Sequence, residues 1–374
     1  MSVPIVLVGG LAATAAERIA DELADGETAV VHHDLCRVTE GVVRRRLRHR
    51  GQDTWTVLEL GHGCVSCTLR EDLLPLVARL SERSDVSRIV LHLDPRMEPE
   101  PICWALDRSR VQAVVTAVDH ERWLEDALGD DTMYERGLGG SADDERTVAQ
   151  VAIGQAEFAD VLVLTGPAGR LDAAFRRLAP TASQVPLGAI DQRHSDWLLS
   201  LPPNARRGRP DNAHGPLLRG QPPLHREDGF ELLLFSERRP FHPERFHANI
   251  DVLLDGVVRT RGRFWLASRP DVALWLESAG GGLQIGHAGP WLAAVDDWSG
   301  VDDDRRAMAA LGWDPYYGDR GQEFVVLTDG ADHAEITAAL RDALVTDAEI
   351  AAGLSAWDGY RDPFLFTDRE DELQ

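Results

Sequence analysis

The stretch VPIVLVGGLAATAAERIADELAD, residues 3–25, decides the fold of the first half of the chain. Residues 3–8 are a continuous apolar run, which predicts a buried strand ended by two glycines. Residues 14–25 have helical periodicity, with Thr14 as the expected N-cap. A buried strand that turns through glycine into a helix begins a βαβ unit, so the sequence predicts a largely parallel sheet.

Further apolar runs alternate with helical segments through the first 200 residues. The helix expected over 68–83 carries Leu69, Leu73, Leu76, Val77 and Leu80 on one face. The alternation predicts an α/β domain over residues 1–200, with helices on both faces of a mostly parallel sheet. The further expected strands are TAVVHH at 28–33, WTVLEL at 55–60, RIVLHL at 88–93, VQAVVTAVD at 111–119 and ADVLVLTG at 159–166.

A change of composition predicts a second domain. Residues 201–228 are rich in Pro, Gly and Arg without periodicity, which favours an interdomain linker. Beyond it, short strand and helix patterns predict a smaller α+β domain over 229–366. The expected strands are FELLLFSE at 230–237, VVRTRGRFWLAS at 257–268, GGLQIGHAG at 281–289 and EFVVLTDG at 323–330, and the expected helices are 243–255 and 333–344.

The composition narrows the possible functions. The chain has 374 residues and a net charge of -23, so it repels phosphate backbones, and no direct DNA binding is expected. It has no apolar run long enough to span a bilayer and no basic segment before its first strand, which favours a cytoplasmic protein without membrane contact. All 39 of its basic residues other than histidine are arginine, because the sequence contains no lysine.

The four cysteines all lie in the first third of the chain, which favours metal binding over a disulfide scaffold. Cys64 and Cys67 form a C-x-x-C pair that can supply two thiolates to Zn²⁺, which prefers four nitrogen and sulfur ligands. Buried reduced thiols or a redox pair are the alternatives. Cys103 stands in an apolar helix and is expected in the core. The further candidate ligands are Cys36, His62 and His92, with His32 and His33 less favoured.

Three motifs resemble the CobW family of P-loop GTPases, which act in metal handling and cobalamin synthesis. GHGCVSCTLREDLLPL at 61–76 is similar to the family's cysteine motif and the helix that follows it, with Ser66 in place of its middle cysteine. Residues 237–271 and 313–327 look like parts of the CobW C-terminal domain. The resemblance implies a P-loop NTPase-like sheet, then a smaller α+β CobW C-terminal domain, with zinc as the bound metal.

The residues that a GTPase needs are missing from their expected positions. The segment GGLAATAAER at 9–18 stands where the family has its P-loop, and no lysine exists to reach the β- and γ-phosphates. His92 replaces an expected acidic residue, and Thr165–Ala168 replaces the guanine-specificity motif. We therefore expect no GTP hydrolysis and doubtful GTP binding. Gly9, Gly10 and Thr14 could still offer N–H groups to an anion, and a plain strand–helix turn is the alternative.

Within the family, the first half looks most like the actinobacterial branch of the mycobacterial recruitment factor, which brings a hibernation factor to the ribosome. Residues 57–76, 99–106 and 146–165 carry this likeness. It implies a non-hydrolysing adaptor that responds to zinc and has a ribosome hibernation factor and, through it, the ribosome as partners. The alternatives are a zinc metallochaperone with residual GTP binding, and a degenerate relative with a structural role only.

The run RRRLRHR at 44–50 is the only dense basic segment. It could contact ribosomal RNA or an acidic partner. A solvated helix face is the interpretation that the charge pattern favours.

Overall fold

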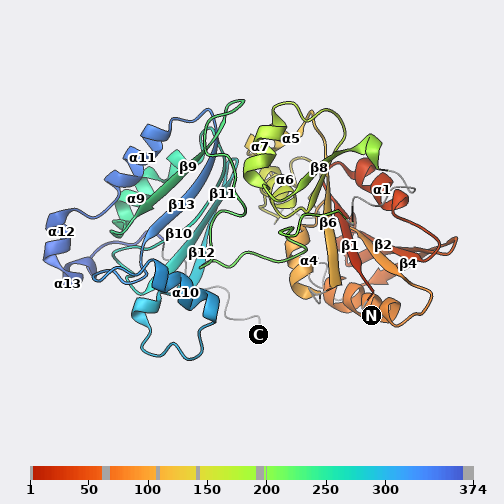
Figure 1. Cartoon of the computed structure of the whole chain (residues 1–374), viewed down its shortest axis with the longest axis horizontal. Helices are drawn as coiled ribbons and strands as arrows, with labels where there is room; N and C mark the ends of the chain where they lie inside the picture. Colours follow the sequence, from red (N-terminus) through yellow and green to blue (C-terminus); the bar gives the residue numbers. More distant parts are fainter. Residues whose placement is uncertain are drawn as a thin grey trace. The chain divides into compact units, whose positions relative to one another are not determined.

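The computed structural model describes residues 3–60, 68–106, 110–139, 144–190, 198 and 200–364 of the chain. The chain divides into two compact units, with the boundary between Asp211 and Asn212, and the short segments 219–223 and 279–282 belong with the first unit. Figure 1 shows a sheet in each unit, with helices packed on it. Within the described residues, no helix combines the length and apolar character needed to cross a bilayer.

The first unit is built on one eight-stranded sheet in the order β4-β3-β2-β5-β1-β6-β7-β8. The strands from β2 to β8 in this order run parallel, and β3 and β4 add an antiparallel hairpin at the edge. The bounds are β1 Ile5–Gly9, β2 Thr28–Asp34, β3 Val42–His49, β4 Gln52–Glu59, β5 Arg88–His92, β6 Val111–Val118, β7 Val161–Leu164 and β8 Ser183–Pro186. The mostly parallel sheet predicted from the sequence is confirmed.

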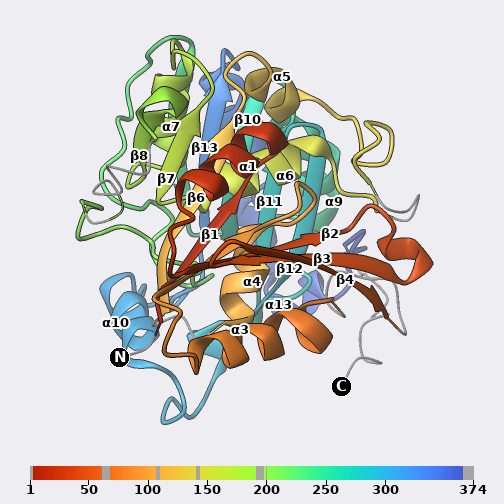
Figure 2. The same ribbon diagram turned by 90° about the vertical axis from the view of Figure 1, so that its right-hand side faces the viewer.

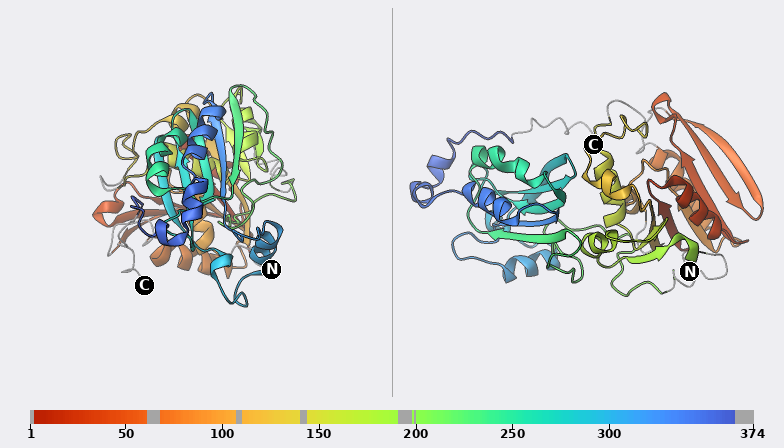
Figure 3. Two further views of the ribbon diagram at one scale, coloured as in Figure 1. Left: turned by 90° about the vertical axis from the view of Figure 1, so that its left-hand side faces the viewer. Right: turned by 90° about the horizontal axis from the view of Figure 1, so that it is seen from above.

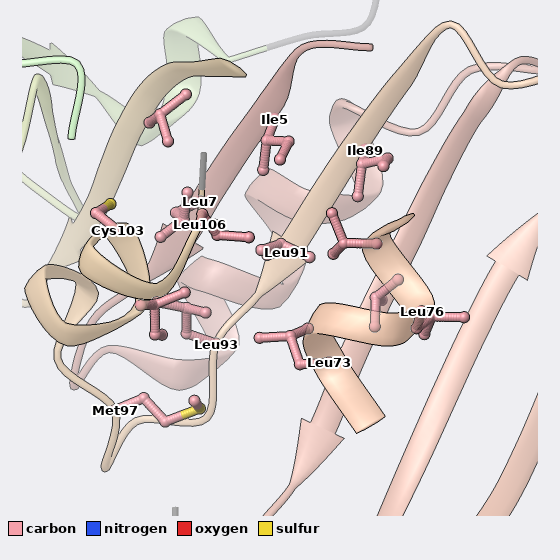
Figure 4. Close-up of a cluster of buried hydrophobic side chains, with 14 of the residues drawn as sticks. Ile5, Leu7, Leu73, Leu76, Ile89, Leu91, Leu93, Met97, Cys103 and Leu106 are labelled. Atoms are coloured by element: carbon pink, nitrogen blue, oxygen red, sulfur yellow. The ribbon is translucent and has the colours of Figure 1, made fainter. Parts of the chain in front are cut away.

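Helices cover both faces of this sheet because alternate residues of the central strands are apolar on both sides. Ile5 and Leu7 of β1 pack in one core with the helix α3 (Leu74–Ser81), as Figure 4 shows, whereas Val6 and Val8 pack with α1 (Ala13–Glu22). Leu73, Leu76, Val77 and Leu80 are buried as predicted. The remaining helical segments are η1 Val38–Glu40, the π-helical turn η2 Leu69–Leu73, α4 Pro99–Ala105, α5 Trp123–Leu128, α6 Val148–Glu157, α7 Leu171–Leu178 and η4 Leu187–Ala189.

The arginine run is part of a strand, so the helix expected for 44–50 is wrong. Arg44 to Arg48 lie in β3, paired with β2 on one side and β4 on the other, and Figure 3 shows this hairpin at the outer edge of the sheet. Each arginine of the run has an acidic partner. The pairs are Arg44–Asp34, Arg45–Asp72, Arg46–Asp53, Arg48–Asp21 and Arg50–Asp85. Pairing with β2 and β4 on both sides holds this strand in the sheet, and the ion pairs match its charges.

The second unit has a five-stranded sheet in the order β12-β11-β10-β13-β9, in which β13 is antiparallel to both of its neighbours. Phe241 and Phe246 are fully buried in the core of this unit, and their rings stack with centroids 4.3 Å apart. Strand β11 has no counterpart among the predicted strands. The bounds are β9 Phe230–Glu237, β10 Val257–Phe264, β11 Val272–Ala279, β12 Gly282–Pro290, β13 Gln322–Asp329, α9 Pro243–Asn249, η5 Ile250–Leu253, η6 Leu292–Ala294, α10 Asp303–Leu311, α11 His333–Asp342, α12 Asp347–Ala352 and α13 Leu354–Trp357.

The segment predicted as a linker, 201–228, is packed along much of its length. The backbone N–H of Arg207 donates to the buried carboxylate of Asp160 at 2.8 Å in the first unit. Within the second unit, the guanidinium of Arg263 donates to the carbonyl oxygens of Ala213 and Gly215. The first half of the segment is therefore tied to folded units by hydrogen bonds to buried groups.

Candidate functional site

A pocket of about 370 Å³ opens beside the carboxyl ends of β2 and β5. In an open parallel sheet this edge is where ligands bind, because the loops after successive strands meet there. Strands β2, β3 and β4 contribute residues to one wall of the pocket, and Figure 2 shows α1 and α3 on opposite sides of these strands. The polar and charged residues of the lining are Thr14, Glu17, His32, Asp34, Cys36, Arg46, Arg48, Trp55, His92 and Asp94.

Two histidines from neighbouring strands lie face to face in this pocket. His32 of β2 and His92 of β5 stack with ring centroids 4.4 Å apart. Nδ1 of His32 lies 2.9 Å from the carbonyl oxygen of His92, and since a carbonyl only accepts, Nδ1 carries the proton. Nε2 of a neutral His32 therefore keeps its lone pair. This arrangement presents an imidazole nitrogen of the kind that binds zinc.

Cys36 lies on the turn that follows β2 and is exposed. Its Sγ is 3.8 Å from a guanidinium nitrogen of Arg96. The carboxylate of Asp34 raises the pKa of the Cys36 thiol, with burial adding to the effect and Arg96 opposing it. The metal-free side chain is therefore a thiol at neutral pH, and it must release a proton when a metal binds.

Asp94 is a pocket residue that the sequence analysis missed, as it missed Asp34. Asp94 is 3% exposed, accepts a hydrogen bond from the backbone N–H of Leu35 at 3.0 Å and pairs with Arg96 at 3.0 Å. It thereby joins the loop after β5 to the turn that carries Cys36. The sequence signal was an aspartate, followed by proline, two residues beyond a buried strand.

Close packing accounts for the glycines in the turn between β1 and α1. Gly10 has φ +130°, and a Cβ added there would lie 2.2 Å from the carbonyl oxygen of Ala117 in β6. Gly9 is the last residue of β1 and is buried. The helix begins after Ala12 with no side-chain cap, so Thr14 is not the N-cap that the sequence predicts. Thr14 is instead exposed in the first turn and lines the pocket, because helix formation starts one residue earlier.

The turn where the guanine-specificity motif is expected is covered by a histidine. The backbone N–H of His120 donates to the hydroxyl oxygen of Thr165 at 3.2 Å. The imidazole of His120 lies directly against Gly166, where an added Cβ would be 2.2 Å from the ring. Residues 165–168 contain no carboxylate, and a side chain of the same domain packs on the backbone of Gly166.

A buried three-residue clamp holds the helix after the cysteine motif against the β2–β3 strands. Asp72 accepts a hydrogen bond from Nε2 of His33 at 2.8 Å and pairs with the guanidinium of Arg45. Burial alone would raise the pKa of Asp72, but the hydrogen bond from His33 and the charge of Arg45 outweigh it and lower that pKa. The carboxylate is therefore ionised at neutral pH. His33, a weak zinc candidate from the sequence, has this structural partner.

The described residues on either side of 61–67 are anchored by hydrogen bonds. Just before it, the backbone N–H of Leu60 donates to the carbonyl oxygen of Gly41 at 2.7 Å, which ties the end of β4 to the turn after η1. Just after it, the Asp72 clamp ties the start of the helix to β2 and β3. Both anchors therefore lie on the elements that flank the turn of Cys36.

The structure brings together several of the predicted site residues. Cys36, His92 and Thr14 line one pocket, along with His32. Cys103 is fully buried in the core, and burial raises the pKa of its thiol to about 12, which agrees with its expected structural role. His62, Cys64 and Cys67 lie outside the described residues. Among the residues that are described, no three His, Cys, Asp or Glu side chains converge on one point that could hold a metal.

We expect His92 to make the stability of the metal-free protein pH-dependent. Burial, aided by His32, Arg48 and Arg46, lowers the pKa of His92 to about 3, whereas an unfolded histidine titrates near pH 6.5. Between these values only the unfolded state binds the proton, so the free energy of unfolding falls as the pH falls, by about 2 kcal/mol between pH 7 and pH 5. Urea unfolding at both pH values measures it.

The matched variants for this measurement are His92→Gln and His287→Gln, the latter at an exposed position of β12. In His92→Gln, most of the fall in the free energy of unfolding between pH 7 and pH 5 should disappear. In His287→Gln, the fall should be as large as in the wild type. If His92→Gln loses as much stability between pH 7 and pH 5 as the wild type, the histidine is not held neutral in the fold.

The fold and the site define a P-loop GTPase-like α/β domain followed by a small domain with an antiparallel sheet. Residues 11–167 match the nucleotide-binding domain of the CobW/HypB/UreG proteins, and residues 230–344 match the C-terminal domain of the cobalamin synthesis protein cobW. The chain belongs to the CobW family.

Two relatives and one solved structure illustrate the likeness. The chain is 47% identical to the zinc chaperone Rv0106 of Mycobacterium tuberculosis, over 97% of this chain and 93% of the relative. It is 27% identical to zinc-regulated GTPase metalloprotein activator 1 of Dictyostelium discoideum, over 84% of this chain and 72% of the relative. The crystal structure of the Zn(II)-bound YjiA GTPase from E. coli aligns with 92% of this chain and all of its own, at 15% identity and a TM-score of 0.38.

Proposed function

We propose that the chain is a cytoplasmic zinc metallochaperone that binds its metal at the pocket edge of the first sheet and does not hydrolyse GTP. The observation that carries the proposal is a pair of contacts, Leu60 to Gly41 and Asp72 to His33, which tie described residues before and after the two cysteines of the motif to the elements around Cys36. The names of the two zinc-related relatives support the same metal.

The donor chemistry near the pocket suits Zn²⁺. Cys36 offers a sulfur, and His32 and His92 offer imidazole nitrogens, which are the ligand types that zinc prefers. Since the described residues alone do not form a complete site, Cys64 and Cys67 supply the remaining thiolates in this proposal. The exposed position of Cys36 suits a site that must release its cargo to another protein.

The absence of hydrolysis follows from the sequence of the P-loop position. Phosphoryl transfer needs a cation beside the β- and γ-phosphates and a hydroxyl group that holds Mg²⁺. Residues 9–18 contain alanines at these places, and the chain has no lysine at all. Arg18, the one basic residue of the segment, lies in the second turn of α1 on its exposed side.

Zinc content tests this function. The metal-loaded wild type, passed over a desalting column, should retain about one zinc per chain by elemental analysis. Cys64→Ser/Cys67→Ser should retain almost none, and Cys36→Ser should bind zinc at least about tenfold more weakly in competition with a chromophoric chelator. Cys103→Ala is the control, and it should keep the metal. Equal and near-zero zinc in the wild type and the double variant would remove the proposal.

A second candidate is the adaptor that recruits a ribosome hibernation factor in response to zinc. The ion pairs of the arginine run favour it over direct RNA binding, because each arginine from 44 to 50 is already matched by a carboxylate. An adaptor with a net charge of -23 would reach the ribosome by binding a protein, and not by binding RNA directly. Pull-down of a purified hibernation factor at low and high zinc tests it, and no capture in either condition would exclude it.

A further inference from the structure

A second pocket, of about 230 Å³, lies within the C-terminal domain and has no part in the function proposed above. One wall is a face of α10 formed by Arg305, Met308 and Ala309, whose spacing of three and four residues puts them on one side of the helix. The opposite walls come from the strand end at Arg238, from Arg263 of β10 and from the segments around Trp291, Asp319 and Glu323.

Three guanidinium groups from three different elements line this pocket. Arg263 pairs with the carboxylate of Glu323. Arg238 donates to the carbonyl oxygens of Arg320 at 3.1 Å and Gly312 at 2.6 Å, and Arg305 donates to the carbonyl oxygen of Pro290. Backbone carbonyls position a guanidinium without neutralising it. Arg238 and Arg305 therefore bring positive charge to the pocket that no ion pair in the described structure compensates.

The remaining charged group of the lining is already engaged. The two carboxylate oxygens of Asp319 accept hydrogen bonds, each at 2.9 Å, from the backbone N–H groups of Leu292 and Ala293. Burial lowers the pKa of His214, so its imidazole is neutral and adds no charge. The formal balance of the lining is three cations against two anions, a positive site in a chain that is strongly acidic overall.

One of these arginines also has an unused donor. Nε of Arg305 is buried, and no acceptor in the described part of the chain reaches it. A buried N–H without a partner is costly, so the guanidinium of Arg305 is not fully satisfied by the folded chain. The buried ring of Trp291 and the side chain of Met308 reduce water access beside it, which strengthens an ionic contact.

We propose that this pocket binds a phosphoryl group. A carboxylate is planar and matches one guanidinium fork, whereas a phosphoryl group has oxygens in several directions and accepts from several forks at once. Guanidinium groups that come from β10, α10 and the end of β9 fit the second geometry. The volume of about 230 Å³ exceeds that of a bare phosphate and leaves space for the first atoms of the molecule that carries it.

Calorimetric titration of the purified full-length protein with inorganic phosphate tests the proposal. We expect saturable binding with a Kd of roughly 1 mM or tighter, since a ligand of so few atoms has limited affinity. Acetate at matched ionic strength should give no saturable heat. Phosphoserine and ribose 5-phosphate are the two further probes, and tighter binding of either one identifies the type of carrier that the pocket accepts.

Two substitutions with the same change of charge separate the pocket from general electrostatics. Arg305→Gln should weaken phosphate binding about tenfold or more. Arg341→Gln, on an exposed face of α11 where the arginine pairs with Glu237, should leave it unchanged. Phosphate should also raise the thermal unfolding midpoint of the wild type, a measurement that needs no variant. No saturable binding to the wild type, or equal weakening in both variants, would overturn the proposal.

Discussion

Replacing Asp72 with alanine is expected to lower the free energy of unfolding by about 3 kcal/mol. Asp72 is 8% exposed, and its carboxylate is the shared partner of the buried His33 and of Arg45. Its removal leaves a guanidinium and an imidazole without their acceptor in a poorly hydrated site, and breaking a buried ion pair from one side is among the most damaging single changes. Urea unfolding at neutral pH followed by circular dichroism measures the loss.

The same substitution should also affect metal binding, because Asp72 fixes the helix that follows Cys64 and Cys67. Loss of a residue that orients metal ligands without touching the metal typically lowers affinity ten- to a hundredfold, so we expect about tenfold weaker zinc binding. The matched control is Asp53→Ala, which removes the exposed carboxylate paired with Arg46. That change should cost about 0.5 kcal/mol and leave zinc binding intact. If Asp72→Ala loses no more stability than Asp53→Ala, the contacts of Asp72 with His33 and Arg45 do not stabilise the fold.

Replacing Gly10 with alanine is expected to destabilise the metal-free, nucleotide-free protein by about 3 kcal/mol or more. Its φ of +130° is unfavourable for any residue with a side chain, and the added Cβ would lie 2.2 Å from the carbonyl oxygen of Ala117. The strand β6 that carries Ala117 is hydrogen-bonded to β1 and cannot move aside without breaking the sheet. Thermal and urea unfolding measure the effect.

The control for this prediction is Gly26→Ala. Gly26 has no neighbouring atom within 4 Å of an added Cβ and no positive φ, so its substitution should change the stability by less than about 1 kcal/mol. A Gly10→Ala protein as stable as the wild type would show that the glycine does not serve packing. Its presence at the degenerate P-loop would then need another explanation, such as the approach of an anion to the backbone.

The sequence predicts the fold well where burial alone decides the structure. The run 3–8 is apolar on both faces because helices cover both sides of β1. A short, continuous apolar run is typical of such a buried strand. The loss of the P-loop lysine is also visible without a structure, since the residue type is absent from the chain. The two-domain architecture and the parallel sheet follow from such local signals.

Long-range partners explain what the sequence could not predict. The arginine run lacks apolar alternation, and its place between β2 and β4, with acidic partners on other elements, is visible only in the structure. His33 is read as a weak zinc candidate because its partner Asp72 lies 39 residues away. The arginine-lined pocket of the second domain could not be predicted for the same reason, because Arg238, Arg263 and Arg305 are widely separated in sequence.

The measurement that tests the central claim most directly is phosphate release from GTP by the purified protein with Mg²⁺, in the presence and absence of zinc. The proposal predicts a rate no higher than that of buffer alone, because the chain cannot place an ammonium group beside the β- and γ-phosphates. Arg18→Ala should leave this background unchanged. Multiple turnovers that require magnesium and persist through repeated purification would contradict the account.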